Sequence, residues 1–272
     1  MPELSLQKQS GYVGAEVFDI HLAHLSETIF EQIQQALFEH GVLFFRAQHL
    51  SPEQHIAFAQ RWGSININRF FTAVEGYPQI AEVRTQPDQQ LVVGGTWHTD
   101  HSYDPAPAMV SILSAQVLPS YGGDTLFASM TGAYECLSKG LQNTLKSLKA
   151  WHSDGSFKLA AQTLATHFSD AGITQPTLHP VIIRHPVTGR KALYVNGDFT
   201  THFEDWSIEE SAPLLSYLYR FATQPILCCR FRWSPGTVAI WDNRLVQHFA
   251  CADYLGQARL MHRITVDGVP LS

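Results

Sequence analysis

Two short stretches that lie far apart in the chain decide its fold: WHTD at residues 97–100 and WDNRLVQH at residues 241–248. The first places His98 two residues before Asp100, and the second ends in His248. In a β-strand, residues two apart point to the same face, so we expect His98 and Asp100 to face one interior. Two imidazoles and one carboxylate form the donor set of an open ferrous iron site. The two stretches therefore predict neighbouring β-strands that hold a metal.

The sequence around these stretches predicts a mainly β fold with flanking helices. Short apolar segments are separated by turn residues and interrupted by only a few helical patterns, which is typical of a β-sandwich or jelly roll rather than a βαβ sheet. We expect strands at residues 42–45, 80–83, 109–118, 125–128, 181–184, 192–195, 226–232, 237–241 and 259–266. There are no repeats and no convincing linkers, so the economical prediction is one domain over residues 1–272.

Four segments predict helices. Residues 26–40 carry an amphipathic pattern that Gly41 ends, and residues 51 to about 63 begin with Ser51, a proline and a glutamine at the capping-box position. Two further helices are expected at residues 131–138 and 207–221, among the strands of the second half.

Composition narrows the class of protein. The net charge of −6 and the absence of a Lys/Arg-rich run argue against nucleic acid as a partner. No apolar stretch is long enough for a membrane span, and the N-terminus lacks a signal-peptide pattern, so we expect a soluble cytoplasmic protein. The four cysteines have no CxxC spacing, which favours reduced thiols over a zinc site or a disulfide framework.

Each half of the metal pattern also has an ordinary structural explanation. Asp100 can cap a turn, and His98 or His248 can be a core histidine with satisfied hydrogen bonds. The combination of all three with Thr125 and Arg259 favours the metal site.

Three separated motifs resemble the taurine dioxygenase family, which also includes the 2,4-dichlorophenoxyacetate dioxygenases. These motifs are residues 97–100, the turn GGDT at residues 122–125, and the block at residues 241–263. The similarity runs from about Val42 to the C-terminus. It implies a double-stranded β-helix, or jelly roll, and a reaction that uses Fe(II), 2-oxoglutarate and O2.

The resemblance also assigns residues to the site. It implies that His98, Asp100 and His248 ligate iron, while Thr125 and Arg259 hold the carboxylates of 2-oxoglutarate. A planar guanidinium suits a carboxylate because it offers two parallel hydrogen bonds. The implied reaction hydroxylates a substrate C–H bond and releases succinate and CO2, with no catalytic residue beyond the metal centre.

The substrate pocket matches the family less closely. Arg263 aligns with an arginine that binds the sulfonate of taurine, although it could instead support the site through a buried carboxylate. Phe199 matches an aromatic pocket residue, and Phe157 matches another less surely. Asn68 and Phe71 replace a histidine and a tyrosine of taurine dioxygenases.

Two further residues complete the predicted pocket. Gly94 replaces an asparagine of taurine dioxygenases, and Tyr103 adds aromatic surface. These differences argue against taurine itself and favour another small organic acid: a sulfonate, an alkyl sulfate, an aryloxy acid or an amino-acid derivative.

Two alternative functions stay open from the sequence. One is a cupin-like iron dioxygenase that does not use 2-oxoglutarate, and the other is a non-catalytic metal-binding β-protein. The expected partner is a small molecule, with no nucleic acid or membrane, and the family resemblance implies a possible homodimer or homotetramer.

Overall fold

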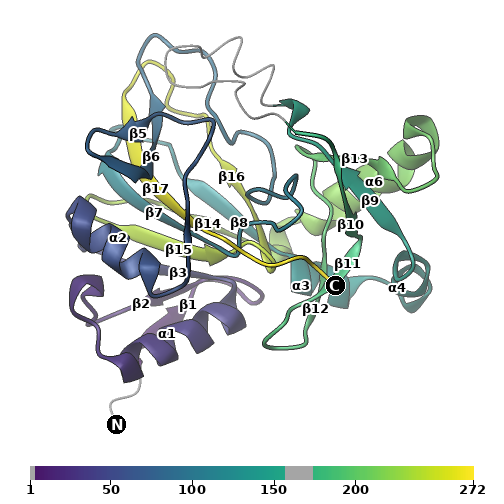
Figure 1. The fold of residues 1–272 in the computed structure, drawn as a ribbon, viewed down its shortest axis with the longest axis horizontal. Coiled ribbons are helices and arrows are strands. Elements are labelled where there is room, and N and C mark those ends of the chain that lie inside the picture. Colours follow the sequence, from purple (N-terminus) through teal and green to yellow (C-terminus); the bar gives the residue numbers. More distant parts are fainter. Residues whose placement is uncertain (1–3, 157–173) are drawn as a thin grey trace.

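The computed structural model describes residues 4–156 and 174–272 and contains the predicted mainly β fold (Figure 1). Its largest element is a sheet of nine strands in the order β1-β2-β3-β15-β7-β17-β6-β5, with β4 beside β17. The strands of this sheet are β1 (Leu6–Lys8), β2 (Ala15–Val17), β3 (Val42–Phe45), β4 (Ile65–Asn66), β5 (Ala73–Val74), β6 (Tyr77–Thr85), β7 (Val110–Val117), β15 (Val238–Asp242) and β17 (Arg259–Val266).

A second, smaller sheet faces the inner side of the large one. It has the order β14-β8-β16 and consists of β8 (Thr125–Ser129), β14 (Cys228–Phe231) and β16 (Val246–Ala250). Phe44 of β3 stacks on Phe231 of β14 with ring centroids 3.8 Å apart, and Phe127 of β8 packs against Trp241 of β15. The two sheets therefore enclose one apolar core, as a jelly roll requires.

The outer side of the large sheet is covered by two helices, α1 (Glu27–His40) and α2 (Pro52–Gln60). Strand β3 shows why both sides are buried: Leu43 and Phe45 pack with these helices, whereas Phe44 points into the core between the sheets. This is the two-residue alternation of a strand that is covered on both faces.

The remaining elements lie beside the small sheet and form a helix-rich part with its own apolar cluster (Figure 1). These elements are α3 (Met130–Cys136), α4 (Lys139–Leu145), β9 (Lys149–His152), β10 (Thr177–Pro180), β11 (Ile182–Arg184), β12 (Lys191–Leu193), β13 (Thr200–Phe203) and α6 (Ile208–Ala222). The described residues also contain two 3-10 helices, η1 (Leu22–His24) and η2 (Pro225–Leu227).

Most sequence predictions of elements are confirmed within a few residues. Ser26 caps α1, Gly41 ends it with φ +74°, and Ser51 and Gln54 form the predicted capping box of α2. The segment at residues 226–232 is partly wrong, because η2 occupies its start and β14 begins only at Cys228. The short strands β1, β2, β4, β5, β9, β10 and β13 and the helix α4 were not predicted.

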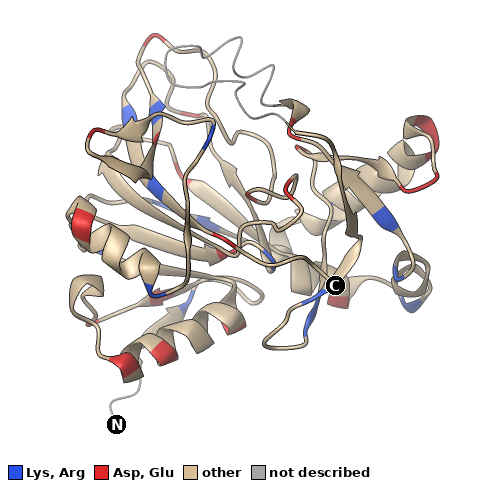
Figure 2. Cartoon of the chain, in the orientation of Figure 1, with Lys and Arg blue, Asp and Glu red and all other residues tan. Residues whose placement is uncertain are grey.

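Charged residues are dispersed along the chain in the view of Figure 2, with acidic residues along α1. All four cysteines are free thiols in the structure. None of the helices in the described ranges combines the length and the apolar character that crossing a membrane requires.

Candidate metal and cosubstrate site

His98, Asp100 and His248 meet in the interior between the two sheets. One nitrogen or oxygen from each lies within 4.8 Å of the others, and all three side chains are buried. Nε2 of His98 is 3.8 Å from Oδ1 of Asp100, and Nε2 of His248 is 3.9 Å from Oδ2. The structure thus brings together the three residues that the sequence predicts as a metal site.

The local backbone differs from the prediction of a strand at residues 97–100. His98 forms a single β-bridge with His248, in which each backbone N–H donates to the other's carbonyl, at 3.1 Å and 2.9 Å. Asp100 already lies in a turn, so the two side chains do not share a face of a regular strand. The turn ends the pairing because His101 adopts a left-handed conformation with φ +57°.

The two histidines are oriented by different means. Nδ1 of His98 lies 2.7 Å from the carbonyl oxygen of Thr96, and a carbonyl only accepts, so Nδ1 carries the hydrogen and Nε2 presents its lone pair to the cluster. His248 is held by ring packing against Trp241 at a centroid distance of 4.7 Å, and its Nδ1 has no hydrogen-bond partner among the described residues. Burial and the neighbouring His98 lower the pKa of His248, which favours the neutral imidazole that binds metals.

Asp100 is held at both carboxylate oxygens. Ser111 Oγ donates to Oδ2 at 2.7 Å, and Nη1 of Arg263 donates to Oδ1 at 3.0 Å. Burial alone would raise the pKa of Asp100, but the charge of Arg263, followed by the nearby His248, lowers it below its usual range. The carboxylate is therefore ionised at neutral pH. Two neutral imidazoles and one carboxylate with open space beside them suit a divalent metal of the ferrous kind.

Arg259 and Thr125 lie in the same cavity. The guanidinium of Arg259 is buried, and its Nε and Nη2 have no hydrogen-bond partner among the described residues. Oγ1 of Thr125 accepts from the indole nitrogen of Trp233 at 3.0 Å, so its own hydrogen is available to a bound acceptor. Gly123, with φ +69°, leaves room for the arginine, since a Cβ there would lie 3.3 Å from Cδ and Nε of Arg259. This arrangement can receive an anion.

Arg263 lies on β17 with Arg259 but makes a different contact. Besides its hydrogen bond to Asp100, its guanidinium lies 4.8 Å from the ring centroid of Phe71. Its Nε is buried without a hydrogen-bond partner in the described part of the chain. The geometry thus matches the alternative that Arg263 supports the site through a buried carboxylate, and it leaves Nε of Arg263 without a hydrogen-bond partner in the described residues.

Only some of the predicted substrate residues line the cavity. Phe71 lines the cavity, whereas Tyr103 and Phe199 pack behind it, with ring centroids 4.9 Å apart and Phe199 against His98. Oδ1 of Asn68 accepts from the backbone nitrogens of Phe70 and Phe71, so this residue shapes a turn. Phe157 lies outside the described residues.

The cavity has a volume of about 310 Å³, and sequence analysis missed several of its walls. The additional lining residues are mostly apolar: Val83, Leu91, Val92, Val93, Gly95, Thr96, Leu113, Ser156, Asp198, Trp241 and Ala250. Gly94 also lines it, with φ +83°, and a Cβ there would lie 3.3 Å from the His98 ring. Burial raises the pKa of Asp198, although His98 opposes the shift. Residues 91–96 carry no strand or helix pattern, and only Gly94 among them was predicted as a pocket residue.

Comparison with known proteins agrees with this geometry. The family model described as "Taurine catabolism dioxygenase TauD, TfdA family" matches residues 5–265. An alkylsulfatase from Acinetobacter baylyi is 35% identical over 98% of this chain and 86% of its own length. An (S)-phenoxypropionate/alpha-ketoglutarate-dioxygenase from Sphingobium herbicidovorans is 33% identical over 100% of this chain and 97% of its own. A crystal structure of a taurine dioxygenase from Burkholderia xenovorans superposes with a TM-score of 0.84 at 31% identity, covering 98% of this chain and 92% of that one.

The chain therefore belongs to the TauD/TfdA dioxygenase family. It is an enzyme of the class that depends on 2-oxoglutarate, which is the alpha-ketoglutarate of the relatives' names.

Proposed function

We propose that this protein, acting as a single domain over residues 1–272, uses Fe(II), 2-oxoglutarate and O2 to hydroxylate a C–H bond of a small organic acid, with release of succinate and CO2. The observation that carries the proposal is one cavity that contains both the His98/Asp100/His248 cluster and the buried, partly unpartnered guanidinium of Arg259.

The cluster fits ferrous iron by its donor chemistry. His98 and His248 offer neutral nitrogens, and Asp100 offers an ionised oxygen, which together form the facial set typical of iron oxygenases. When bound, the iron supplies the activation of O2 that protein side chains cannot provide. The chain's own contribution is to keep Asp100 charged, to keep His248 neutral and to surround both with apolar walls that exclude water.

Arg259 and Thr125 fit the dicarboxylate cosubstrate. A buried guanidinium with free N–H groups is costly unless an anion occupies the site, and a carboxylate satisfies two of these groups together. The hydroxyl hydrogen of Thr125 supplies a further donor. We assign the carboxylates of 2-oxoglutarate to these two residues.

The primary substrate is proposed from the walls and from the relatives. The Acinetobacter and Sphingobium proteins are named for an alkyl sulfate ester and an aryloxy acid, both of which combine an apolar body with an anionic group. The cavity offers apolar walls and the guanidinium of Arg263, whose Nε has no hydrogen-bond partner in the described residues. We assign Arg263 and Phe71 as direct substrate contacts. Tyr103 and Phe199 would act from behind the wall, and Asn68 would act through the turn that carries Phe71.

The experiment measures succinate from 2-oxoglutarate with Fe(II) and a panel of alkyl sulfates, sulfonates and aryloxy acids. We expect at least one acid to stimulate succinate release and to appear as a hydroxylated or cleaved product. Product formation without 2-oxoglutarate, unchanged in Arg259→Ala, would support a cupin-like iron dioxygenase instead. Metal binding with no succinate under any condition would support a non-catalytic protein.

We further propose a homo-oligomer, a dimer or a tetramer, on the basis of the family resemblance. Light scattering coupled to size exclusion measures the mass in solution, and a monomer of 30.5 kDa would contradict it.

A further inference from the structure

Asp100 lies in a turn, and no strand pairing fixes its position. His98 beside it is bridged to His248, but the chain then enters a turn. We propose that Asn243 and Ser111 are positioning residues that hold both the backbone and the carboxylate of Asp100 in the orientation needed for the metal. This inference rests on the proposed function, because it assigns the metal to the His98/Asp100/His248 cluster.

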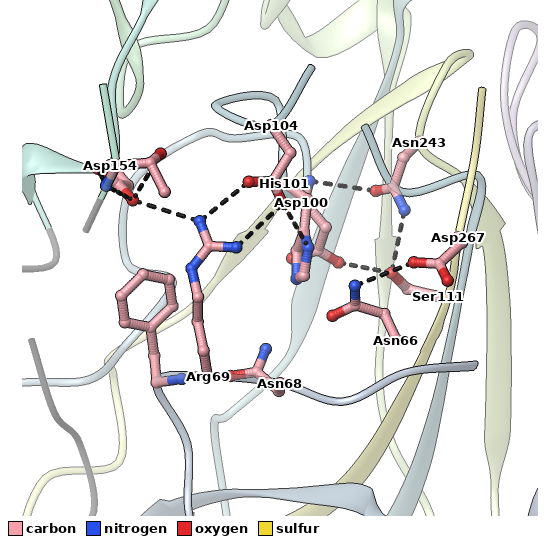
Figure 3. Close-up of polar contacts among 12 residues, drawn as sticks. Asn66, Asn68, Arg69, Asp100, His101, Asp104, Ser111, Asp154, Asn243 and Asp267 are labelled. Atoms are coloured by element: carbon pink, nitrogen blue, oxygen red, sulfur yellow. Dashed lines mark hydrogen bonds and ion pairs between the residues drawn. The ribbon is translucent and has the colours of Figure 1, made fainter. Parts of the chain in front are cut away.

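Asn243 connects the backbone of Asp100 to Ser111 among the polar contacts in Figure 3. Its Oδ1 accepts from the backbone nitrogen of Asp100 at 3.2 Å and from Nε1 of Trp241 at 2.9 Å. Its Nδ2 donates to Oγ of Ser111 at 3.0 Å. An indole nitrogen only donates, so the contact with Trp241 fixes which end of the amide is oxygen. Asn243 is 1% exposed, which leaves it little freedom to rearrange.

Ser111 connects Asn243 to the carboxylate of Asp100 and orients that carboxylate. A hydroxyl has one hydrogen, and because Ser111 accepts from Asn243, that hydrogen is free for Oδ2 of Asp100, 2.7 Å away. The hydrogen bonds therefore run in one direction, from Trp241 through Asn243 and Ser111 to Asp100. The torsion that turns a carboxylate about its own axis is broad, so a donor at a defined place is needed to fix it.

The network also determines which lone pairs of the Asp100 carboxylate stay available for a metal. Ser111 occupies one lone pair of Oδ2, and Arg263 occupies one lone pair of Oδ1. Each carboxylate oxygen can accept more than one hydrogen bond or ligand, so lone pairs stay available on the side of the two imidazoles. Partners of this kind outside the ligand set commonly change metal affinity by about 10- to 100-fold when they are removed.

The network joins the two sequence stretches in a way that the ligands alone do not explain. Asn243 lies in the turn between β15 and β16, five residues before His248, and Ser111 lies on β7, which pairs with β15. The turn that leads to one metal ligand thereby holds another.

The test is Mn(II) binding to the protein by electron paramagnetic resonance, with no turnover involved. We compare the wild type, Ser111→Ala and Asn243→Ala with the control Ser114→Ala. Ser114 is a buried serine on the same strand, and its hydroxyl accepts from Gln116 at 2.9 Å instead of contacting Asp100. We expect Ser111→Ala to weaken Mn(II) binding by about 10-fold and Asn243→Ala by up to about 100-fold, with Ser114→Ala at the wild-type value.

Each outcome separates the two claims. If the wild type binds Mn(II) and Ser111→Ala binds it as tightly as Ser114→Ala does, the positioning role is wrong and the metal site stands. If the wild type itself binds no Mn(II), the proposed function fails, and the positioning role fails with it. Ser111→Ala removes a single oxygen atom, so it keeps the test decisive even if Asn243→Ala does not fold.

Discussion

Arg259 and Arg263 lie on the same strand, β17, and line the same cavity, yet they meet different chemistry. Arg259 keeps Nε and Nη2 without a hydrogen-bond partner in the described residues, whereas Arg263 gives Nη1 to Asp100. One guanidinium is therefore available for an external anion, and the other already serves as the counter-ion of an internal carboxylate. The comparison shows that a buried arginine in an active site does not by itself define the charge of the substrate.

The largest effect is expected when the carboxylate of Asp100, which pairs with Arg263 and not with Arg259, is removed. Asp100→Ala removes a proposed metal ligand and leaves Arg263 as a buried, unpaired charge. We expect metal affinity to fall by more than about 100-fold, beyond what loss of an outer partner costs. Isothermal titration with Mn(II) measures it, and wild-type affinity in this variant would show that the metal binds elsewhere.

Arg259→Lys tests the end of the cavity that is open to an anion. Lysine keeps the charge but loses the paired N–H groups, so we expect 2-oxoglutarate binding to lose about 2–3 kcal/mol, or about 30- to 150-fold in Kd. Titration with 2-oxoglutarate in the presence of Mn(II) measures the change, and Mn(II) affinity alone serves as the control that should not move. An unchanged Kd for 2-oxoglutarate would remove Arg259 from the cosubstrate site.

Arg263→Gln tests the part of the cavity where Arg263 pairs with Asp100. Glutamine can still donate one hydrogen bond to Asp100 but carries no charge, so we expect metal affinity to fall by about 10-fold. The Kd for 2-oxoglutarate, measured at saturating metal, should stay at the wild-type value. If the variant loses only stimulation by anionic substrates and keeps its metal affinity, Arg263 acts on the substrate rather than on Asp100.

A smaller effect is expected from the ion pair that supports the turn before His248. Burial raises the pKa of Asp242, but Arg244 lowers it more strongly, with help from His185, to about 2. A carboxylate with a lowered pKa stabilises the fold fully above its unfolded pKa near 4 and loses that contribution as the pH falls through about 2.

Urea unfolding between pH 5 and pH 2 tests this contribution. The difference in unfolding free energy between the wild type and Asp242→Asn should shrink by about 2 kcal/mol as the pH falls across this range. A difference that does not depend on pH would show that the charge of Asp242 is not stabilising.

The sequence predicted the metal end of the cavity far better than the substrate end. The spacing of His98 and Asp100 identified two side chains that meet His248, although the strand that justified the prediction is absent, because a turn also directs the two side chains inward. Tyr103 and Phe199 were predicted as contacts but pack behind the wall, since an aromatic residue gives the same signal in a core as in a pocket.

The residues that hold Asp100 in place could not be identified from one sequence. Asn243 and Trp241 stood inside the quoted stretch, but their roles depend on contacts with Ser111 and Asp100, which lie more than a hundred residues earlier in the chain. Such contacts depend on strand pairing, here between β15 and β7. The local sequence pattern of a strand does not indicate which other strand it pairs with.

The central claim is that His98, Asp100 and His248 hold a metal that 2-oxoglutarate reaches from the side of Arg259. Anaerobic addition of Fe(II) and then 2-oxoglutarate, followed by visible absorption, tests it most directly. We predict a charge-transfer band in the wild type that saturates at one iron per chain, is absent in His98→Ala, and needs more 2-oxoglutarate in Arg259→Lys. No band in the wild type, or an undiminished band in His98→Ala, would contradict the account.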